Sequence, residues 1–339
     1  MLKQIKTKKQ WALEPRSTKL EVLREIDKRQ GLTQHKKYKN ELYLLEKGNR
    51  GEERFLHYLK TNGAPHWTVL RNVWLEYYGE FECDVLLVTH LGLHAFEVKN
   101  YSGKLELRNN QCVRNGKVIG HNPFSQTQKS TTNLTEIINQ HSHALTVQGV
   151  LSFVGTHNNV QLHDNVSGID VLQLNELQRY IRHLAQVERR HFNKPINLDA
   201  ILAALHKYEV GQPSKEKEIP EKIKNNVRKG ICCSHCGNFE AKLTKTYLIC
   251  PCGLYEPRIE AVIRTICEYG VIHHQKNLTT TALTDFFAGK VSRSTIFRFL
   301  NQYFERTGSY KDAQYINKFA PFIKVKSEFK LQQAKYKRL

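Results

Sequence analysis

The sequence predicts an α/β protein with a mixed central sheet flanked by helices, followed by a small cysteine ribbon and an α-helical C-terminal module. Two observations predict the core. Short segments rich in Val, Leu and Phe have the composition of strands, and amphipathic stretches with the pattern of helices separate them. A third observation, two pairs of closely spaced cysteines, predicts the ribbon. At 339 residues with 40% apolar content, the chain is long enough for two or three domains.

The first elements are expected to be helical. Apolar residues recur at helical spacing on both sides of Gly31, which predicts two helices within residues 17–46. A separate helix is expected from Gly51. Three strands should follow, at residues 67–70, 81–89 and 93–100.

The second half of the core repeats helices and strands. Asn122 is expected to cap a helix that begins at Pro123 and ends near Asn139, and Asn175 is expected to cap a later one. The other elements expected here are strands at residues 150–154 and 169–172 and a helix at residues 198–208.

Asp84, Glu97 and Lys99 lie in two neighbouring strands that together predict a β-hairpin. If Leu91–Gly92 forms a two-residue turn, Asp84 faces Lys99 and Glu97 is its diagonal neighbour, so the three side chains share one face. Such positions place side chains roughly 5 to 8 Å apart, a gap that one divalent ion held by two carboxylates closes. The spacing therefore suits a metal site.

These residue types suit the hydrolysis of a phosphodiester. Carboxylate-bound Mg²⁺ acidifies water and offsets the charge that builds on the phosphate, and Lys99 would add a fixed positive charge. The alternative is that Glu97 and Lys99 form a simple charge pair on an exposed strand. The neighbouring residues are apolar on both faces, where charges are rarely placed without a partner or an ion. Spacing alone leaves both alternatives open.

Four short segments follow one another along the expected core: Gly48–Glu53, Cys83–Asp84, Phe96–Gly103 and Asn122–Gln126. Together they resemble the nuclease-related domain, NERD, a family similar to the PD-(D/E)xK restriction-endonuclease-like nucleases. The resemblance covers roughly residues 45–150. It implies a restriction-endonuclease-like core in which Asp84 and Glu97 bind Mg²⁺ or Mn²⁺ and Lys99 is the catalytic cation. It also implies site roles for Glu52, on the preceding helix, and for Gln126.

The positive charge lies outside this core. The formal net charge is +20; residues 1–47 hold 13 Lys and Arg against 6 Asp and Glu, and residues 211–339 hold 23 against 11. Residues 48–210 therefore have a net charge of about +1. Basic flanks around a near-neutral core predict a nucleic-acid partner, DNA in preference to RNA. The alternative is that the lysine-rich helices are merely solvated.

Cys233, Cys236, Cys250 and Cys252 form two pairs about a dozen residues apart, each followed by a glycine. Four thiolates at such spacing predict a structural Zn²⁺ ribbon, although the second pair is separated by one residue instead of the usual two. Disulfides are the alternative, and nothing in the sequence indicates the export that favours them.

Three helices are expected beyond the ribbon, beginning near residues 257, 282 and 293, with Ser292 as the cap of the last. Residues 288–291 have the length of a helix-turn-helix turn. In that geometry the start and exposed side of the recognition helix would carry Arg293, Ser294, Thr295 and Arg298 as nucleic-acid-binding residues. Plain helix packing is the alternative.

Other classes of protein receive no support. The sequence has no run of 18 apolar residues, no signal-peptide pattern and no phosphate-binding Gly-rich loop, so we expect a cytoplasmic protein without a Walker-type nucleotide site. The expected domains are a basic helical segment (1–47), the nuclease-like domain (48–210), a linker (211–230), the ribbon (231–256), the helix-turn-helix-like module (257–306) and a basic tail (307–339).

Two functions follow from these expectations. The first is a divalent-metal-dependent nuclease acting on DNA and targeted by its C-terminal modules. The second is a non-catalytic DNA-binding or regulatory protein that uses the nuclease fold as a platform. Cleavage of DNA distinguishes them.

Overall fold

The computed structural model describes residues 5–7, 19–108, 111–141, 145–163, 168–190, 197–210, 219–309 and 312–317. The chain divides into two compact units. Unit 1 comprises residues 1–13 and 45–213, and unit 2 comprises residues 14–44 and 214–339. The boundary between residues 44 and 45 falls within one helix, α2 (Lys36–Asn62).

Unit 1 is built on a six-stranded sheet in the order β1-β2-β3-β4-β8-β10. Its strands are β1 (Ile5–Thr7), β2 (Thr68–Glu76), β3 (Glu80–Thr89), β4 (Gly92–Lys99), β8 (Thr146–Phe153) and β10 (Ile169–Gln173). The β2–β3 and β3–β4 pairs are antiparallel, whereas β1–β2, β4–β8 and β8–β10 are parallel. The predicted mixed sheet is therefore confirmed.

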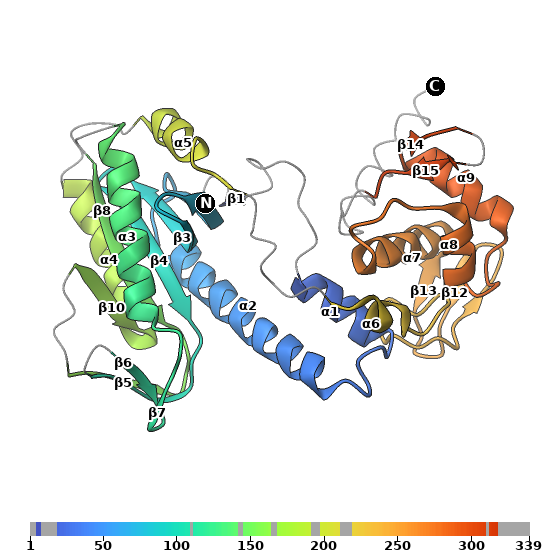
Figure 1. Ribbon diagram of the computed structural model, residues 1–339, viewed down its shortest axis with the longest axis horizontal. Helices are drawn as coiled ribbons and strands as arrows, with labels where there is room; N and C mark the ends of the chain where they lie inside the picture. The colour runs from blue at the N-terminus through green and yellow to red at the C-terminus, as the bar shows by residue number, and fades with distance from the viewer. Residues whose placement is uncertain are drawn as a thin grey trace. The chain divides into compact units, whose positions relative to one another are not determined.

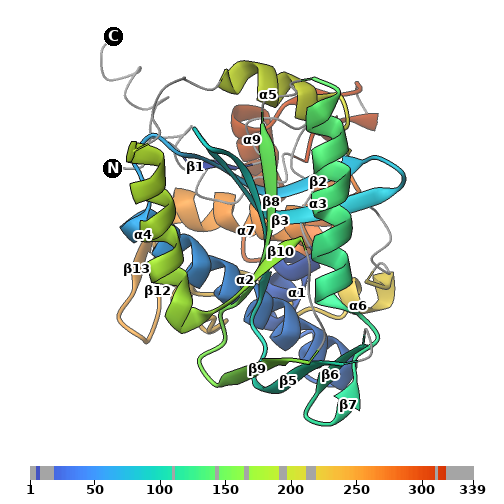
Figure 2. The same cartoon turned by 90° about the vertical axis from the view of Figure 1, so that its left-hand side faces the viewer.

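Helices cover both faces of this sheet, and Figure 2 shows α3 (Pro123–Asn139) and α4 (Leu174–Arg190) on opposite sides of the central strands. One apolar cluster joins α2 and α4 to the strands through residues such as Phe55, Phe96 and Ile181. A second cluster joins α3 and α5 (Leu198–His206) to the other face. Apolar burial on both faces holds the α/β layers together.

The helix that follows residue 121 begins as predicted. Asn122 caps α3 by accepting a hydrogen bond from the Phe124 N–H at 3.0 Å, and Pro123 is the first helical residue. The predicted cap at Asn175 is wrong, because α4 already begins at Leu174. There the Glu176 carboxylate accepts the N–H of Gln173 at 2.8 Å, so an acidic side chain inside the first turn replaces the cap.

The helix predicted from Gly51 is not separate. α2 runs without interruption from Lys36 to Asn62, so the second helix expected before residue 46 and the helix expected after Gly51 are one element. Gly51 serves close packing, since a Cβ there would lie 2.6 Å from the Asn100 Cβ. A Cβ at Gly48 would meet nothing within 4 Å.

A smaller sheet in unit 1 was not expected from the sequence. It has four strands in the order β7-β6-β5-β9, namely β5 (Gly103–Arg108), β6 (Gln111–Arg114), β7 (Lys117–Val118) and β9 (Asn158–Leu162). The sheet continues directly from β4 and packs its own apolar cluster against Phe124 and Phe153. Figure 2 shows these strands gathered at one end of the unit.

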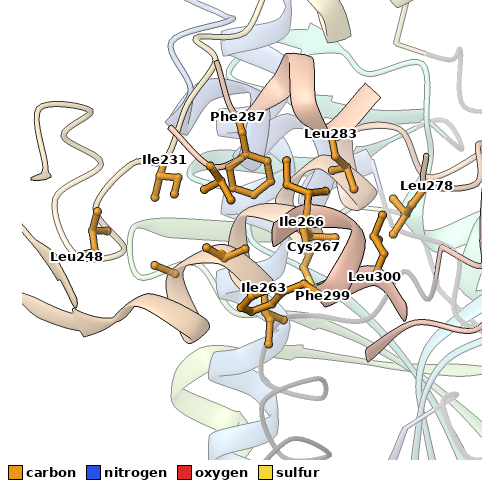
Figure 3. Packing of buried hydrophobic residues seen from close by; sticks show 14 of the residues in the cluster. Ile231, Leu248, Ile263, Ile266, Cys267, Leu278, Leu283, Phe287, Phe299 and Leu300 are labelled. Atoms are coloured by element: carbon orange, nitrogen blue, oxygen red, sulfur yellow. The ribbon is translucent and has the colours of Figure 1, made fainter. Parts of the chain in front are cut away.

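Unit 2 combines a small ribbon with helices. Its elements are α1 (Lys19–Lys28), α6 (Glu221–Asn225), β11 (Lys242–Leu243), β12 (Tyr247–Ile249), β13 (Tyr255–Pro257), α7 (Arg258–Ile272), α8 (Thr280–Phe286), α9 (Arg293–Tyr303), β14 (Arg306–Thr307) and β15 (Gln314–Tyr315). The strands β11, β12 and β13 form a three-stranded antiparallel sheet. Figure 3 shows Leu248 of the ribbon together with Ile266 of α7, Leu283 of α8 and Leu300 of α9 in one buried cluster.

A buried ion network joins α1 to α7 within unit 2. The Glu268 carboxylate pairs with Lys28 and Arg264, each at 2.6 Å, and with Arg29, which is fully buried. Arg29 also donates to the carbonyls of Arg228 and Gly230. Residues 14–44 therefore share a unit with residues 214–339 (Figure 1).

The segments expected as linker and tail are partly described. Residues 219–230 of the expected linker include α6 and the buried Ile219 and Ile223, while residues 211–218 lie outside the described part. In the expected tail, Tyr315 is fully buried and pairs with Leu278, whereas residues 318–339 are also outside it. None of the described helices is long and apolar enough to cross a membrane.

Candidate functional site

The β3–β4 hairpin carries the predicted trio in a register that differs from the expected one. The ladder begins at Thr89 and Gly92, so the two-residue turn is His90–Leu91, and the turn at Leu91–Gly92 that the sequence argument considered does not form. Gly92 belongs to the strand, where its φ is +135° and a Cβ would lie 2.3 Å from the Thr146 carbonyl oxygen of β8. Gly92 therefore pairs with β8 as a strand residue and is not part of the turn.

The register shift has a direct effect on the carboxylates. The last paired residues are Val85 and Phe96, so the next position in this register sets Asp84 opposite Glu97 instead of Lys99. A shift by two residues preserves the face, because side chains alternate with a period of two. Asp84, Glu97 and Lys99 consequently stay on one face of the hairpin.

The two strands separate beyond this point, and Asp84 spans the opening. The β3–β4 ladder ends at Val85, although both strands continue. The Asp84 Oδ2 accepts a hydrogen bond from the Val98 N–H at 2.8 Å, which satisfies a donor in β4 just past the end of the ladder. The side chain is thereby held in the gap between the strands.

Four carboxyl groups surround this gap: Glu52 of α2, Glu82 and Asp84 of β3, and Glu97 of β4. Burial, and then the charge of Asp84, raises the pKa of Glu52 to about 7 and that of Glu97 to about 8. Burial and the charges of Asp84, Glu97 and Glu52 raise the pKa of Glu82 to about 8. Burial also raises the pKa of Asp84, against the opposing effects of Lys99 and the Val98 N–H.

Glu82 was missed by the sequence reasoning, although a signal was available. It lies two residues before Asp84 on the same strand, so strand alternation predicts that both side chains point to one face. Glu82 is half-buried, and its charge interacts with the other three carboxylates. The acidic group is therefore larger than the trio predicted from the sequence.

Lys99 is the cation of this cluster. Its ammonium pairs with the Glu97 carboxylate two residues earlier on β4. Burial alone would lower the pKa of Lys99, but the charges of Glu97 and Asp84 outweigh burial and raise it. Lys99 therefore keeps its positive charge while it is partly buried beside the carboxylates.

The other two predicted positions differ in their surroundings. Arg71 of β2 lies 3.5 Å from the Glu52 carboxylate, which links α2 to the sheet next to the gap. Gln126 lies in the first turn of α3, where its side-chain oxygen hydrogen-bonds to the His121 ring. A serine one turn further along α3, Ser130, donates to the Glu82 carbonyl at 3.3 Å.

The carboxyl groups have the donor chemistry of a site for a hard divalent cation. Oxygen ligands from Asp and Glu are those that Mg²⁺ and Mn²⁺ prefer. Burial destabilises all four carboxylates, acidic neighbours add to this for Glu52, Glu82 and Glu97, and a bound cation would offset these effects. Asp84 and Glu97, which the register places opposite each other, are the metal ligands expected from the sequence.

The four predicted cysteines of unit 2 also lie together. The sulfur atoms of Cys233, Cys236, Cys250 and Cys252 are all within 4.8 Å of one another. Cys233 and Cys252 are separated by 3.7 Å and Cys236 and Cys250 by 3.5 Å, and all four are free thiols. Sulfur ligands about 2.3 Å from one tetrahedral Zn²⁺ would be about 3.8 Å apart, so the set could hold this ion.

Local backbone geometry supports the cysteine cluster. Gly237 and Gly253 follow the two pairs with φ values of +70° and +90°, which fold the chain back around the sulfurs. Although burial would raise the pKa of Cys233, the N–H groups of Cys236 and His235 lower it to about 7. Cys232, next to Cys233 in the sequence, is buried with its sulfur 3.9 Å from the Glu268 carboxylate.

The C-terminal helices contain the turn expected between them. Ala288 and Gly289 have φ values of +48° and +74°, and the Ser292 hydroxyl caps α9 by accepting the Thr295 N–H at 3.3 Å. Arg293, Ser294 and Arg298 are exposed, and Thr295 is half-buried. Two arginines and the helix N-terminus thus form a basic surface on α9.

Comparison with known families identifies the domain that contains the carboxyl cluster. Residues 47–154 match the nuclease-related domain family, NERD. Searches of curated proteins and of solved structures each gave no match. The matched range contains Glu52, Glu82, Asp84, Glu97 and Lys99, together with the hairpin that positions most of them. The chain therefore carries a nuclease-related domain at residues 47–154.

Proposed function

We propose that this protein is a divalent-metal-dependent nuclease that hydrolyses phosphodiester bonds in DNA. The observation that carries the proposal is the cluster of the buried Glu97 with the partly buried Asp84 and Lys99, at the gap between β3 and β4 within a nuclease-related domain. A charge pair on an exposed strand would not bring several carboxyl groups with raised pKa values together.

Asp84 and Glu97 would hold Mg²⁺ or Mn²⁺, which supplies acidified water and offsets charge on the phosphate. Lys99 remains protonated and places a fixed positive charge where negative charge develops in the transition state. Glu52, whose charge acts on Glu82 and Glu97, is proposed to accept a proton from the attacking water. Gln126 is proposed as a polar residue near the substrate.

Unit 2 is the proposed DNA-binding part. It holds 31 Lys and Arg against 16 Asp and Glu, whereas unit 1 holds 21 against 16. Charge excess of this kind favours binding to a polyanion. The helix pair α8–α9 is proposed to act as a helix-turn-helix module in which Arg293, Ser294, Thr295 and Arg298 contact DNA. The four cysteines are proposed to bind a structural Zn²⁺.

Cleavage assays test the catalytic proposal. The purified protein is incubated with plasmid, linear DNA, single-stranded DNA and RNA, with and without Mg²⁺ or Mn²⁺. We expect metal-dependent cleavage of DNA that falls by at least about 100-fold in Asp84→Ala and Lys99→Ala. Lys104→Ala is a matched control, because Lys104 also pairs with a glutamate two residues away, Glu106, but its own side chain is exposed on β5.

The outcomes are distinct. Metal-independent cleavage, or equal cleavage by Lys104→Ala and Lys99→Ala, would contradict the proposed site. Absence of cleavage with undiminished DNA binding would leave the non-catalytic platform as the function. For the binding surface, the double variant Arg293→Ala, Arg298→Ala should bind DNA with lower affinity. Because it loses about two phosphate contacts, the slope of log affinity against log salt concentration should become shallower by about two. Lys276→Ala, an exposed lysine that pairs with Glu221, should not change either property.

A further inference from the structure

A second group of potential metal ligands lies in unit 1, away from the carboxyl cluster. His66 lies between α2 and β2, His90 lies in the β3–β4 turn, and Glu188 lies near the C-terminal end of α4. Their ligand atoms are all within 4.8 Å of one another. Three segments far apart in the sequence thus bring together two imidazoles and a carboxylate.

The Glu188 carboxylate is buried and firmly oriented. Glu188 is 1% exposed, and its neighbours on α4, including Leu184 and Ala185, belong to an apolar cluster. Its Oε2 accepts the indole N–H of Trp67 at 2.6 Å, and its Oε1 accepts the backbone N–H of His90 at 2.5 Å. Fixed donors of this kind orient the carboxylate ligands of metal sites.

The two histidines complete a recognised donor set. The His66 Nε2 is 2.9 Å from the Glu188 Oε2, and the His66 and His90 rings have centroids 4.8 Å apart. Two imidazoles and one carboxylate form the three-ligand set of zinc sites that keep one position open. The side chain of His66 is 42% exposed, so solvent can reach the fourth position.

A purely structural role for Glu188 is the competing explanation. Hydrogen bonds to Trp67 and to the His90 backbone already satisfy a buried carboxylate. That explanation requires neither imidazole, yet both rings lie beside the carboxylate. The charge of Glu188 also acts on a third histidine, His94 of β4, which is 8% exposed. The surroundings of Glu188 are therefore unusually rich in imidazole groups.

We propose that His66, His90 and Glu188 bind a divalent first-row transition ion such as Zn²⁺, with Trp67 as the supporting donor. The ion joins the loop after α2, the β3–β4 turn and the end of α4. His90 is six residues along β3 from Asp84, a separation on the order of 20 Å in an extended strand. Imidazole ligands favour Zn²⁺ over Mg²⁺, so the site differs from the carboxyl cluster in position and in metal preference.

Tryptophan fluorescence offers a selective test. All three tryptophans, Trp11, Trp67 and Trp74, belong to unit 1, whereas the cysteine cluster belongs to unit 2. The full chain is stripped of metal and titrated with Co²⁺ in excess Mg²⁺, which occupies oxygen ligands. We expect Co²⁺ to quench tryptophan fluorescence, because Trp67 is hydrogen-bonded to a proposed ligand. Zn²⁺ should then prevent the quenching.

Variants assign the response to its ligands. In His66→Ala and in His90→Ala, the Co²⁺ concentration that gives half of the quenching should rise by at least about tenfold. Each variant should also retain one fewer equivalent of Zn²⁺ than wild type. His57→Ala, which removes an exposed histidine of α2, should behave as wild type. His66→Gln provides a second variant that keeps the polar surface. Unchanged fluorescence in wild type, or equal quenching in His66→Ala, His66→Gln and His57→Ala, would overturn the proposal.

Discussion

Replacing Glu97 with glutamine should stabilise metal-free unit 1 at alkaline pH while it removes a metal ligand. The Glu97 carboxyl is 3% exposed, and burial together with the charge of Asp84 raises its pKa to about 8 from a usual value of 4.5. A carboxyl group with a raised pKa binds its proton more tightly in the folded protein than in the unfolded chain. Stability is consequently lost as the pH rises from about 4.5 to about 8.

The magnitude follows from this pKa difference. Each pKa unit corresponds to about 1.4 kcal/mol in the free energy of unfolding. Between about pH 5 and pH 9 the loss accumulates over about three units, up to the pKa of about 8, which gives about 4 kcal/mol. The glutamine side chain of the variant cannot ionise, so Glu97→Gln should lack this loss. At about pH 5 the carboxyl group is protonated in the folded wild type, and the stabilities of the two proteins should be similar.

Urea unfolding in the presence of a chelator measures the effect. Tryptophan fluorescence follows unit 1 alone, because the three tryptophans all belong to it. Glu80→Gln is the matched control, since it removes an exposed glutamate from β3 and should keep the pH dependence of wild type. If Glu97→Gln loses as much stability between pH 5 and pH 9 as wild type does, the coupling of the carboxyl groups described above is incorrect.

Three further predictions concern the rest of the molecule. Gly51→Ala should destabilise unit 1 by roughly 1–3 kcal/mol in urea unfolding, because its Cβ would meet Asn100, whereas Gly48→Ala in the same helix should stabilise it by about 0.5–1 kcal/mol. Equal effects would contradict this packing. Burial would raise the pKa of Glu268, but the charges of Arg264, Arg29 and Lys28 lower it to about 2. Unit 2 should therefore lose stability as the pH falls from about 4.5 to about 2, which circular dichroism can follow during unfolding. The Glu268→Gln variant should lack this dependence on pH. Metal analysis should find one fewer Zn²⁺ in Cys236→Ser and an unchanged content in Cys112→Ala; equal contents would exclude the cysteine cluster as a zinc site.

The common face of Asp84, Glu97 and Lys99 could be predicted because it depends only on strand alternation. The register could not be predicted, since it depends on a tertiary contact. Gly92 packs against Thr146 of β8, more than 50 residues later, and this contact moves the turn to His90–Leu91. The prediction of one face survived because the error was two residues, which restores the parity of a strand.

Long-range packing also explains what the sequence could not predict about the division into units. The local pattern of α1 indicates an amphipathic helix but not its partner. The partner is α7, reached through the pairing of Lys28 and Arg29 with Glu268, about 240 residues away. Likewise, the sequence spacing of His66, His90 and Glu188 gives no indication that they meet. In contrast, the cysteines of the ribbon are close in sequence, and their proximity was predictable.

Cleavage of supercoiled plasmid should be measured side by side for wild type and Glu97→Gln at about pH 8, with Mg²⁺ added back to chelator-treated protein. We expect Mg²⁺-dependent cleavage by wild type and a loss of at least about 100-fold in the variant, although the metal-free variant is the more stable protein. A defect in folding cannot produce that combination. Equal cleavage by the two proteins, or cleavage by wild type without a divalent ion, would contradict the assignment of Glu97 as a ligand of the catalytic metal.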